Sequence, residues 1–164
     1  MTVELTAQLL RELLHYEPST GVFTRLVATS GLYGCVGRVC GTPDKDGYSR
    51  ISLMSRKYGA HRLAWLYTTG SWPKQQIDHI NGNRSDNHIS NLRDVTPRMN
   101  TENQTRSHLR SKVRLLGVSE CKNKFRATIQ VDGRRINLGV FESAEAAHAQ
   151  YIKSKRVMHA GCTL

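Results

Sequence analysis

IDHINGNRSDNHISNLRDVTPRMNTEN, residues 77–103, decides the fold of the central part of this chain. Two short apolar runs flank a stretch rich in Asn, Asp, Gly and Ser, a composition typical of loops. Thr96 then precedes Pro97, which suits a helix N-cap followed by the first helical position. The pattern predicts a strand, a loop, a second strand and a helix, at residues 76–80, 81–91, 92–95 and 97–105.

The polar residues of this unit have a characteristic spacing. Asp78-His79, Asn91 and Asn100 resemble the HNH nuclease motif, in the DH…N…N variant of phage-encoded and intron-encoded endonucleases, and the resemblance extends over about residues 60–103. It implies a ββα-metal nuclease core. In such a core His79 is the general base, Asp78 and Asn100 hold a divalent metal, and Asn91 orients the loop that follows the histidine.

The chemistry of phosphodiester hydrolysis explains these residue types. An imidazole suits a general base because its unperturbed pKa is about 6.5. The oxygen ligands of Asp78 and Asn100 suit Mg²⁺, or another divalent cation such as Mn²⁺. Adjacent residues of a regular strand point to opposite faces, so Asp78 and His79 converge only if the strand ends or twists there.

Other polar residues near the motif have two interpretations. His61 lies on a predicted helix, 61–69, and fits a packed, hydrogen-bonded histidine better than a metal ligand. His88 fits a solvated loop residue better than a DNA contact. Arg84 and Arg93 are predicted phosphate contacts, although ordinary surface arginines would show the same pattern.

The last third of the chain predicts a three-stranded antiparallel sheet backed by one helix. Its middle strand, Lys124–Val131, alternates apolar and polar residues, and Asp132-Gly133 is typical of a tight hairpin. Ser143 predicts the cap of a helix that ends near Gly161. The other strands are expected at 113–119 and on the return of the hairpin, where Ile136, Leu138 and Val140 would face the core.

Residues 104–164 hold 12 Lys and Arg against 4 Asp and Glu, which is +8 of the chain's net +11. Residues 117–156 resemble an AP2-type DNA-binding domain, although Phe125 and Asn137 stand where that family often has Trp. The resemblance implies that the sheet enters the DNA major groove, whereas a solvated charged face is the alternative. The implied DNA contacts are Lys122, Lys124, Arg126, Thr128, Arg135 and Asn137.

The whole chain is therefore expected to be an α+β protein. The expected domains are an N-terminal helix and hairpin region, the nuclease core, a linker and the AP2-like domain, at residues 1–59, 60–105, 106–112 and 113–164. A helix is expected at 4–15, with strands near 22–26 and 48–53. Cys35 and Cys40 are spaced like half of a zinc site, but no second pair completes it, so reduced thiols are expected.

The predicted function is a metal-dependent DNA endonuclease that nicks double-stranded DNA as a monomer, without an obligate protein partner. A non-catalytic DNA-binding regulator and a nuclease for RNA or structured nucleic acid remain as alternatives. No signal peptide or membrane span is evident, so a cytoplasmic protein is expected, in a bacterial host if a phage encodes it.

Overall fold

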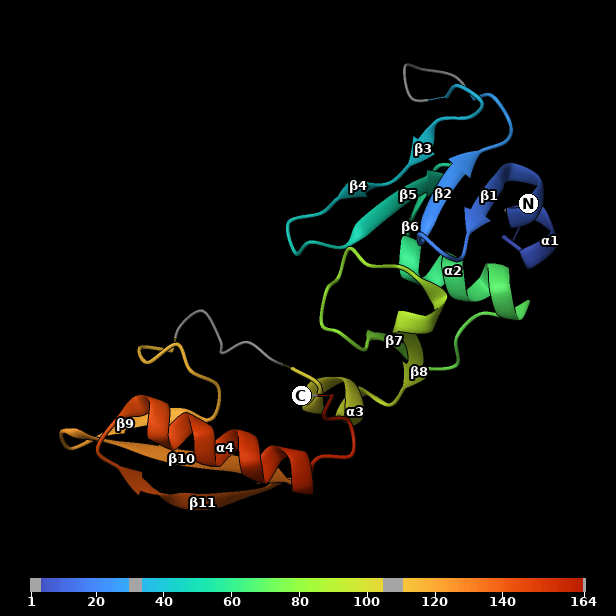
Figure 1. Ribbon diagram of the computed structural model, residues 1–164. Coiled ribbons are helices and arrows are strands. Elements are labelled where there is room, and N and C mark those ends of the chain that lie inside the picture. The colour runs from blue at the N-terminus through green and yellow to red at the C-terminus, as the bar shows by residue number, and fades with distance from the viewer. Residues whose placement is uncertain (1–3, 30–33, 105–110, 164) are drawn as a thin grey trace. The chain divides into compact units, whose positions relative to one another are not determined.

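The computed structural model describes residues 4–29, 34–104 and 111–163. The described chain divides into two compact units, Met1–Val95 and Thr96–Leu164 (Figure 1). The predicted boundary at residue 105 lies within the second unit, and most of the predicted linker lies outside the described residues. Each unit is described by itself.

The first unit opens with helix α1 (Ala7–Leu13), which Thr6 caps by accepting a hydrogen bond from the amide of Leu9 at 3.2 Å. The sequence predicted a helix to residue 15, and this end was wrong. Leu14 instead begins strand β1 (Leu14–Glu17), which pairs with β2 (Val22–Arg25). Leu14 and Tyr16 alternate into the core, a strand period that the leucine repeat of the helix concealed.

Two three-stranded sheets and one helix complete the core of this unit. The first sheet has the order β1-β2-β3, and the second has the order β4-β5-β6. The remaining elements are β3 (Val39–Cys40), β4 (Thr42–Pro43), β5 (Ser49–Leu53), β6 (Arg56–Gly59) and α2 (Ala60–Thr69). Phe23, Ile51 and Leu63 are almost fully buried where these elements meet.

Strands β7 (Gln76–His79) and β8 (Leu92–Val95) form a separate antiparallel pair at the end of the first unit. Both strands form where the short apolar runs predicted them. The polar stretch between them is a loop that ends in a 3-10 turn, η1 (Ile89–Asn91).

The second unit begins with helix α3 (Pro97–Glu102), which Thr96 caps as predicted by accepting from the amide of Met99. The sheet follows in the order β11-β10-β9, and helix α4 (Ala144–Met158) packs on it. Its strands are β9 (Val118–Cys121), β10 (Lys124–Val131) and β11 (Arg134–Phe141). A sheet with one helix was predicted, although the first strand forms at 118–121 rather than at 113–119.

A bulge in the hairpin changes which residues of β11 face the core. The register between β10 and β11 shifts between Ala127 and Thr128. Val140 therefore lies opposite Arg126 and is 47% exposed, so the prediction that it faces the core was wrong. The extra residue could not be predicted from the sequence, because apolar and polar residues alternate on both sides of the bulge.

Buried polar contacts hold helix α3 against the rest of the second unit. Glu102 is 7% exposed, pairs with Arg98 at 2.8 Å and accepts a hydrogen bond from the amide of Gly161 at 3.0 Å. A side chain at Gly161 would lie 2.3 Å from the carbonyl oxygen of Met99, so only glycine fits against this helix. Lys155 of α4, also buried, donates to the carbonyl of Gln104.

Candidate active site

The carboxylate of Asp78 is buried opposite an arginine. Antiparallel pairing of β7 and β8 sets Asp78 directly across from Arg93. Arg93 donates from Nε at 2.9 Å and from Nη2 at 2.7 Å to Oδ2 of Asp78. The arginine that the sequence offered as a phosphate contact thus pairs with a buried carboxylate through two hydrogen bonds.

His79 is also buried, at 4% exposed, although it follows Asp78 directly in the strand. Its Nε2 lies 3.3 Å from Oδ1 of Asn87, an oxygen that can only accept, so Nε2 carries the proton. Burial lowers the pKa of His79, and the hydrogen bond that His79 donates to Asn87 opposes this only in part. The ring is therefore neutral near pH 7, and in this tautomer Nδ1 bears the lone pair.

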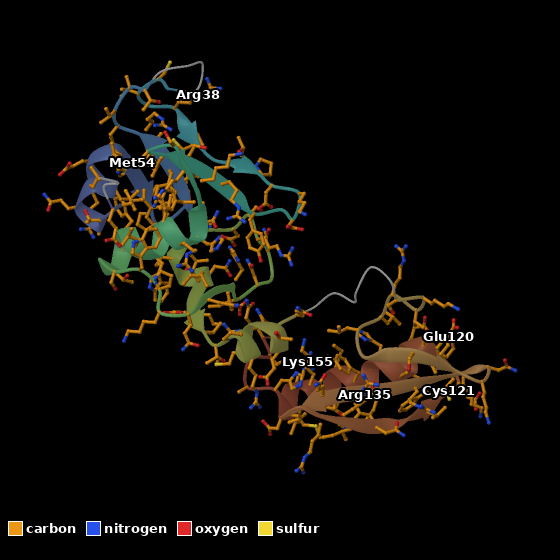
Figure 2. All side chains as sticks on the ribbon, turned by 180° about the vertical axis from the view of Figure 1, so that it is seen from behind. Arg38, Met54, Glu120, Cys121, Arg135 and Lys155 are labelled. Carbon is orange, nitrogen blue, oxygen red and sulfur yellow. The ribbon has the colours of Figure 1, made fainter. Side chains whose placement is uncertain are left out.

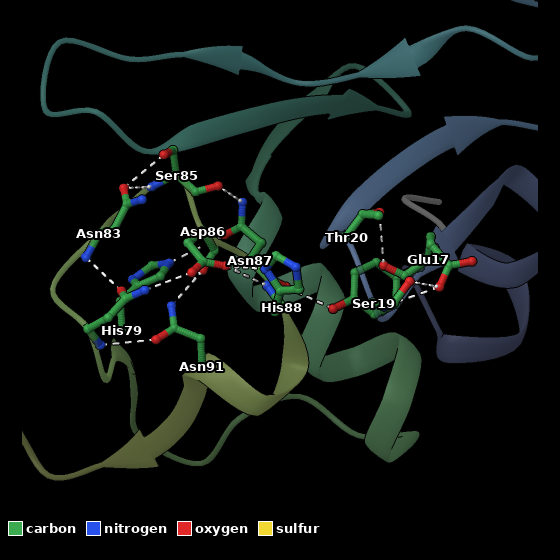
Figure 3. Close-up of polar contacts among 12 residues, drawn as sticks. Glu17, Ser19, Thr20, His79, Asn83, Ser85, Asp86, Asn87, His88 and Asn91 are labelled. Carbon is green, nitrogen blue, oxygen red and sulfur yellow. Dashed lines mark hydrogen bonds and ion pairs between the residues drawn. The ribbon is translucent and has the colours of Figure 1, made fainter.

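Asn91 joins the two ends of the loop that follows His79 (Figure 3). Its side-chain oxygen accepts from the amide of Asn81 at 3.0 Å, and its Nδ2 donates to the carbonyl of Asp86 at 2.9 Å. The Asp86 carboxylate pairs with His88, which is half-buried in this loop. These contacts support the loop-orienting role that the sequence suggested for Asn91.

Three residues that the sequence did not assign to the site surround His79 closely. Asn87 is one of them, and its own backbone carbonyl accepts from the hydroxyl of Tyr16 at 2.8 Å. The others are Tyr48 and His61, whose ring centroids lie 5.9 and 5.3 Å from that of His79. No local pattern in the sequence marked Asn87 or Tyr48, whereas His61 was noted only as a packed histidine.

Arg84 lies over the same group of rings. Its guanidinium carbon is 4.9 Å from the ring centroid of Tyr48, and its Nη1 donates to the carbonyl of Asp46 at 2.9 Å. The positive charge of Arg84 also contributes to the lowered pKa of His79. An exposed arginine beside this histidine is suited to an anionic ligand, as the sequence suggested.

Asn100 lies one turn into α3, where its amide bonds to the carbonyl of Thr96 at 3.0 Å. It belongs to the second unit, whereas Asp78 belongs to the first. The described residues contain no cluster of three or more His, Cys, Asp or Glu suited to a metal. Each of the two residues carries an oxygen of the hard kind that Mg²⁺ prefers as a ligand.

The second unit offers a candidate nucleic-acid face on its sheet. Cross-strand partners share a face, so Thr128 lies beside Asn137, and Arg135 lies beside Gln130. Alternation along β10 adds Arg126 to the same face. Figure 2 labels Arg135 on this sheet. Of the six predicted contacts, Thr128 is half-buried and the others are exposed, namely Lys122, Lys124, Arg126, Arg135 and Asn137. Helix α4 packs against the buried residues Ala127 and Ile129 of β10, which alternate with these.

Two exposed cations of this face already have partners within the unit. Lys124 pairs with the exposed carboxylate of Glu142, and Arg126 donates from Nη2 to the sulfur of Cys121 at 2.9 Å. Exposed ion pairs of this kind are weak, so a phosphate can replace the carboxylate at little cost.

Comparisons with known proteins agree with the motif. Residues 58–102 match the family model described as HNH endonuclease. YosQ of Bacillus subtilis (strain 168), named as an SPbeta prophage-derived HNH homing endonuclease, is 39% identical over 56 residues, 34% of this chain and 32% of that protein. The DNA endonuclease I-HmuI of Bacillus phage SP01 is 37% identical over 65 residues, 37% of each chain.

The matches span about a third of the length of these relatives. No solved structure matched the chain. No helix among the described residues is both long enough and apolar enough to cross a bilayer. The resemblance inferred from Asp78-His79, Asn91 and Asn100 thus agrees with these matches, and residues 58–102, here called the HNH segment, are similar to HNH endonucleases.

Proposed function

We propose that this protein is a divalent-metal-dependent endonuclease that hydrolyses phosphodiester bonds of double-stranded DNA, with His79 as its general base. The observation that carries the proposal is a buried, neutral imidazole directly after a buried carboxylate, within a segment that matches HNH endonucleases. The names of the two relatives, one a DNA endonuclease, support DNA as the substrate. Their prophage and phage sources support a bacterial cytoplasm as the setting.

The proton transfer follows from the tautomer of His79. Nε2 donates to Asn87, which leaves Nδ1 to accept a proton from the attacking water as its oxygen bonds to phosphorus. The bond from phosphorus to the leaving 3′-oxygen then breaks. Asn91 keeps the loop after His79 in place, and Arg84 is positioned to pair with a phosphate oxygen.

A divalent ion such as Mg²⁺ would be held by Asp78 and Asn100, and when bound it would neutralise the charge that develops on the phosphate and on the leaving oxygen. Arg93 pairs with the carboxylate of Asp78 at 2.7 Å. One such ion serves one strand, so a monomer is proposed to nick. The exposed face of β10 and β11 is proposed to hold the duplex in the manner of an AP2-like module.

Supercoiled plasmid incubated with the purified full chain tests the proposal. Mg²⁺ should convert it to the nicked form, whereas EDTA or His79→Ala should leave it supercoiled. His15→Ala is the matched control, because His15 is exposed on β1, and it should nick normally. Full activity in EDTA would refute metal dependence. Binding without cutting would favour a DNA-binding regulator, and cutting of RNA alone would favour an RNA nuclease.

A further inference from the structure

His61 brings a second imidazole to the ring of His79. It lies in the first turn of α2, and the two rings meet edge to face, with an interplanar angle of 68°. The Nε2 atom of His79 also bonds to Oδ1 of Asn87 at 3.3 Å. The edge-to-face contact with the His61 ring adds to what fixes the orientation of His79.

The orientation of His61 is itself set by its surroundings. A side-chain carbon at Gly59 would lie 2.7 Å from Cε1 of His61, so the backbone at Gly59 lies directly against the imidazole. Tyr48 contacts the ring as well, with 5.3 Å between centroids. The His61 ring is thus held in place beside His79. A larger side chain at Gly59 would displace the His61 ring.

Burial of the Nδ1 atom of His61 costs free energy. Its Nδ1 is buried and has no hydrogen-bond partner among the described residues. Burial lowers the pKa of His61 to about 4, so the ring is neutral at pH 7. Phenylalanine would offer an aromatic surface without an unsatisfied polar atom, which is normally avoided in a protein interior. A packing role alone leaves the imidazole unexplained.

We propose that His61 is a positioning residue for the reaction at His79: its imidazole holds the His79 ring in the orientation in which it accepts the proton of the attacking water. The inference rests on the proposed function for its consequence in catalysis. The contact between the two rings can be tested without any cleavage.

The test compares His61→Phe, His61→Asn and His61→Gln with the wild-type full chain. In metal-free, ¹⁵N-labelled protein, the imidazole nitrogens of His79, assigned with His79→Ala, should shift in His61→Phe, while those of His159 should not. In plasmid nicking, His61→Phe should lower kcat about tenfold or more, because small displacements of a reacting group are costly. The Kd for DNA should stay within about twofold.

His61→Asn and His61→Gln each keep one polar position of the imidazole. The amide of Asn lies near the place of Nδ1, and that of Gln lies near the place of Nε2. Because Nδ1 is buried, Asn, which keeps a polar atom there, should preserve the His79 spectrum better than Gln does. Circular dichroism will show whether the phenylalanine variant folds. If it does not, the comparison of Asn with Gln tests whether His61 positions His79.

His15→Phe supplies the control, since an exposed histidine of β1 should change neither readout. An unchanged His79 spectrum in His61→Phe would overturn the positioning role. A changed spectrum with wild-type kcat would show that the orientation does not matter for catalysis and would equally overturn the proposal. If the wild type does not nick DNA, the proposed function fails, whereas the spectra still report on His61 and His79.

Discussion

Asp78 and Arg93 face each other across the two-stranded sheet, with Nη2 of the arginine 2.7 Å from Oδ2 of the carboxylate. The side chain of Asp78 is only 7% exposed, whereas that of Arg93 is 24% exposed. A carboxylate so buried depends on its partner, because an unpaired charge in a protein interior is costly. The pair therefore links the stability of the first unit to a proposed metal ligand.

Replacement of Arg93 should expose this dependence. Arg93→Ala should lower the free energy of unfolding by about 1–3 kcal/mol, because it leaves the Asp78 carboxylate buried without its guanidinium partner. If Asp78 binds a divalent ion, Mg²⁺ should restore part of the loss. Urea unfolding with and without Mg²⁺ measures both effects. Arg135→Ala, at an exposed position, is the control. Equal stability of Arg93→Ala and wild type would contradict the prediction.

The buried imidazole of His61 should make the stability depend on pH. Its pKa is about 4 in the folded chain and about 6.5 when unfolded, so the unfolded chain binds more protons between these values. The contribution of His61 to the free energy of unfolding is thus complete above about pH 6.5 and is lost as the pH falls toward about 4. The total loss over this range is about 3 kcal/mol. The order of magnitude follows from about 1.4 kcal/mol per pKa unit.

Urea unfolding of wild type and His61→Phe across this range isolates the effect. Wild type should lose stability faster than the variant as the pH falls from about 6.5 to about 4.5, above the range in which most carboxylates titrate. Parallel curves for the two proteins would show that His61 does not titrate between the two states as expected.

Asn91 should matter for catalysis more than for DNA affinity. Asn91→Ala removes the hydrogen bonds to the amide of Asn81 and to the carbonyl of Asp86, which hold the loop after His79. We expect kcat for nicking to fall about tenfold to a hundredfold, with Kd nearly unchanged, because the loop orients the base. Asn83→Ala is the matched control, since its side chain caps only an exposed turn at Ser85. Similar losses in both variants would mean that the loop tolerates no change at all.

Local signals in the sequence were enough for the elements of the HNH segment. The apolar runs of β7 and β8 and the cap at Thr96 each depend on neighbouring residues, so they could be predicted. The strands β1, β3, β4 and β6 could not, because such short strands are defined by their partners rather than by their own composition.

The residues that surround the site could not be predicted from the sequence, for the same reason. Tyr48 reaches His79 from β4–β5, and Tyr16 reaches Asn87 from β1, so both contacts join distant parts of the chain. The pairing of Asp78 with Arg93 required the register of β7 and β8, which composition does not set. The residue types of the motif predicted the chemistry, whereas the side chains that tune it appeared only in the structure.

The sheet of the second unit should bind DNA through its exposed cations. Arg126→Ala and Arg135→Ala should each weaken duplex binding and lower the slope of log affinity against log salt by about 0.9 if the arginine contacts a phosphate. If it reads a base instead, sequence preference should relax, at about 1–3 kcal/mol for a lost bidentate contact.

Arg126→Lys separates the two cases, because lysine keeps the charge but not the bidentate geometry. Lys153→Ala is the control, since Lys153 is exposed on α4 rather than on the sheet. Fluorescence anisotropy over a range of salt concentrations gives all the slopes. Unchanged affinity in both arginine variants would mean that this face is only a solvated surface and that the first unit holds the DNA by itself.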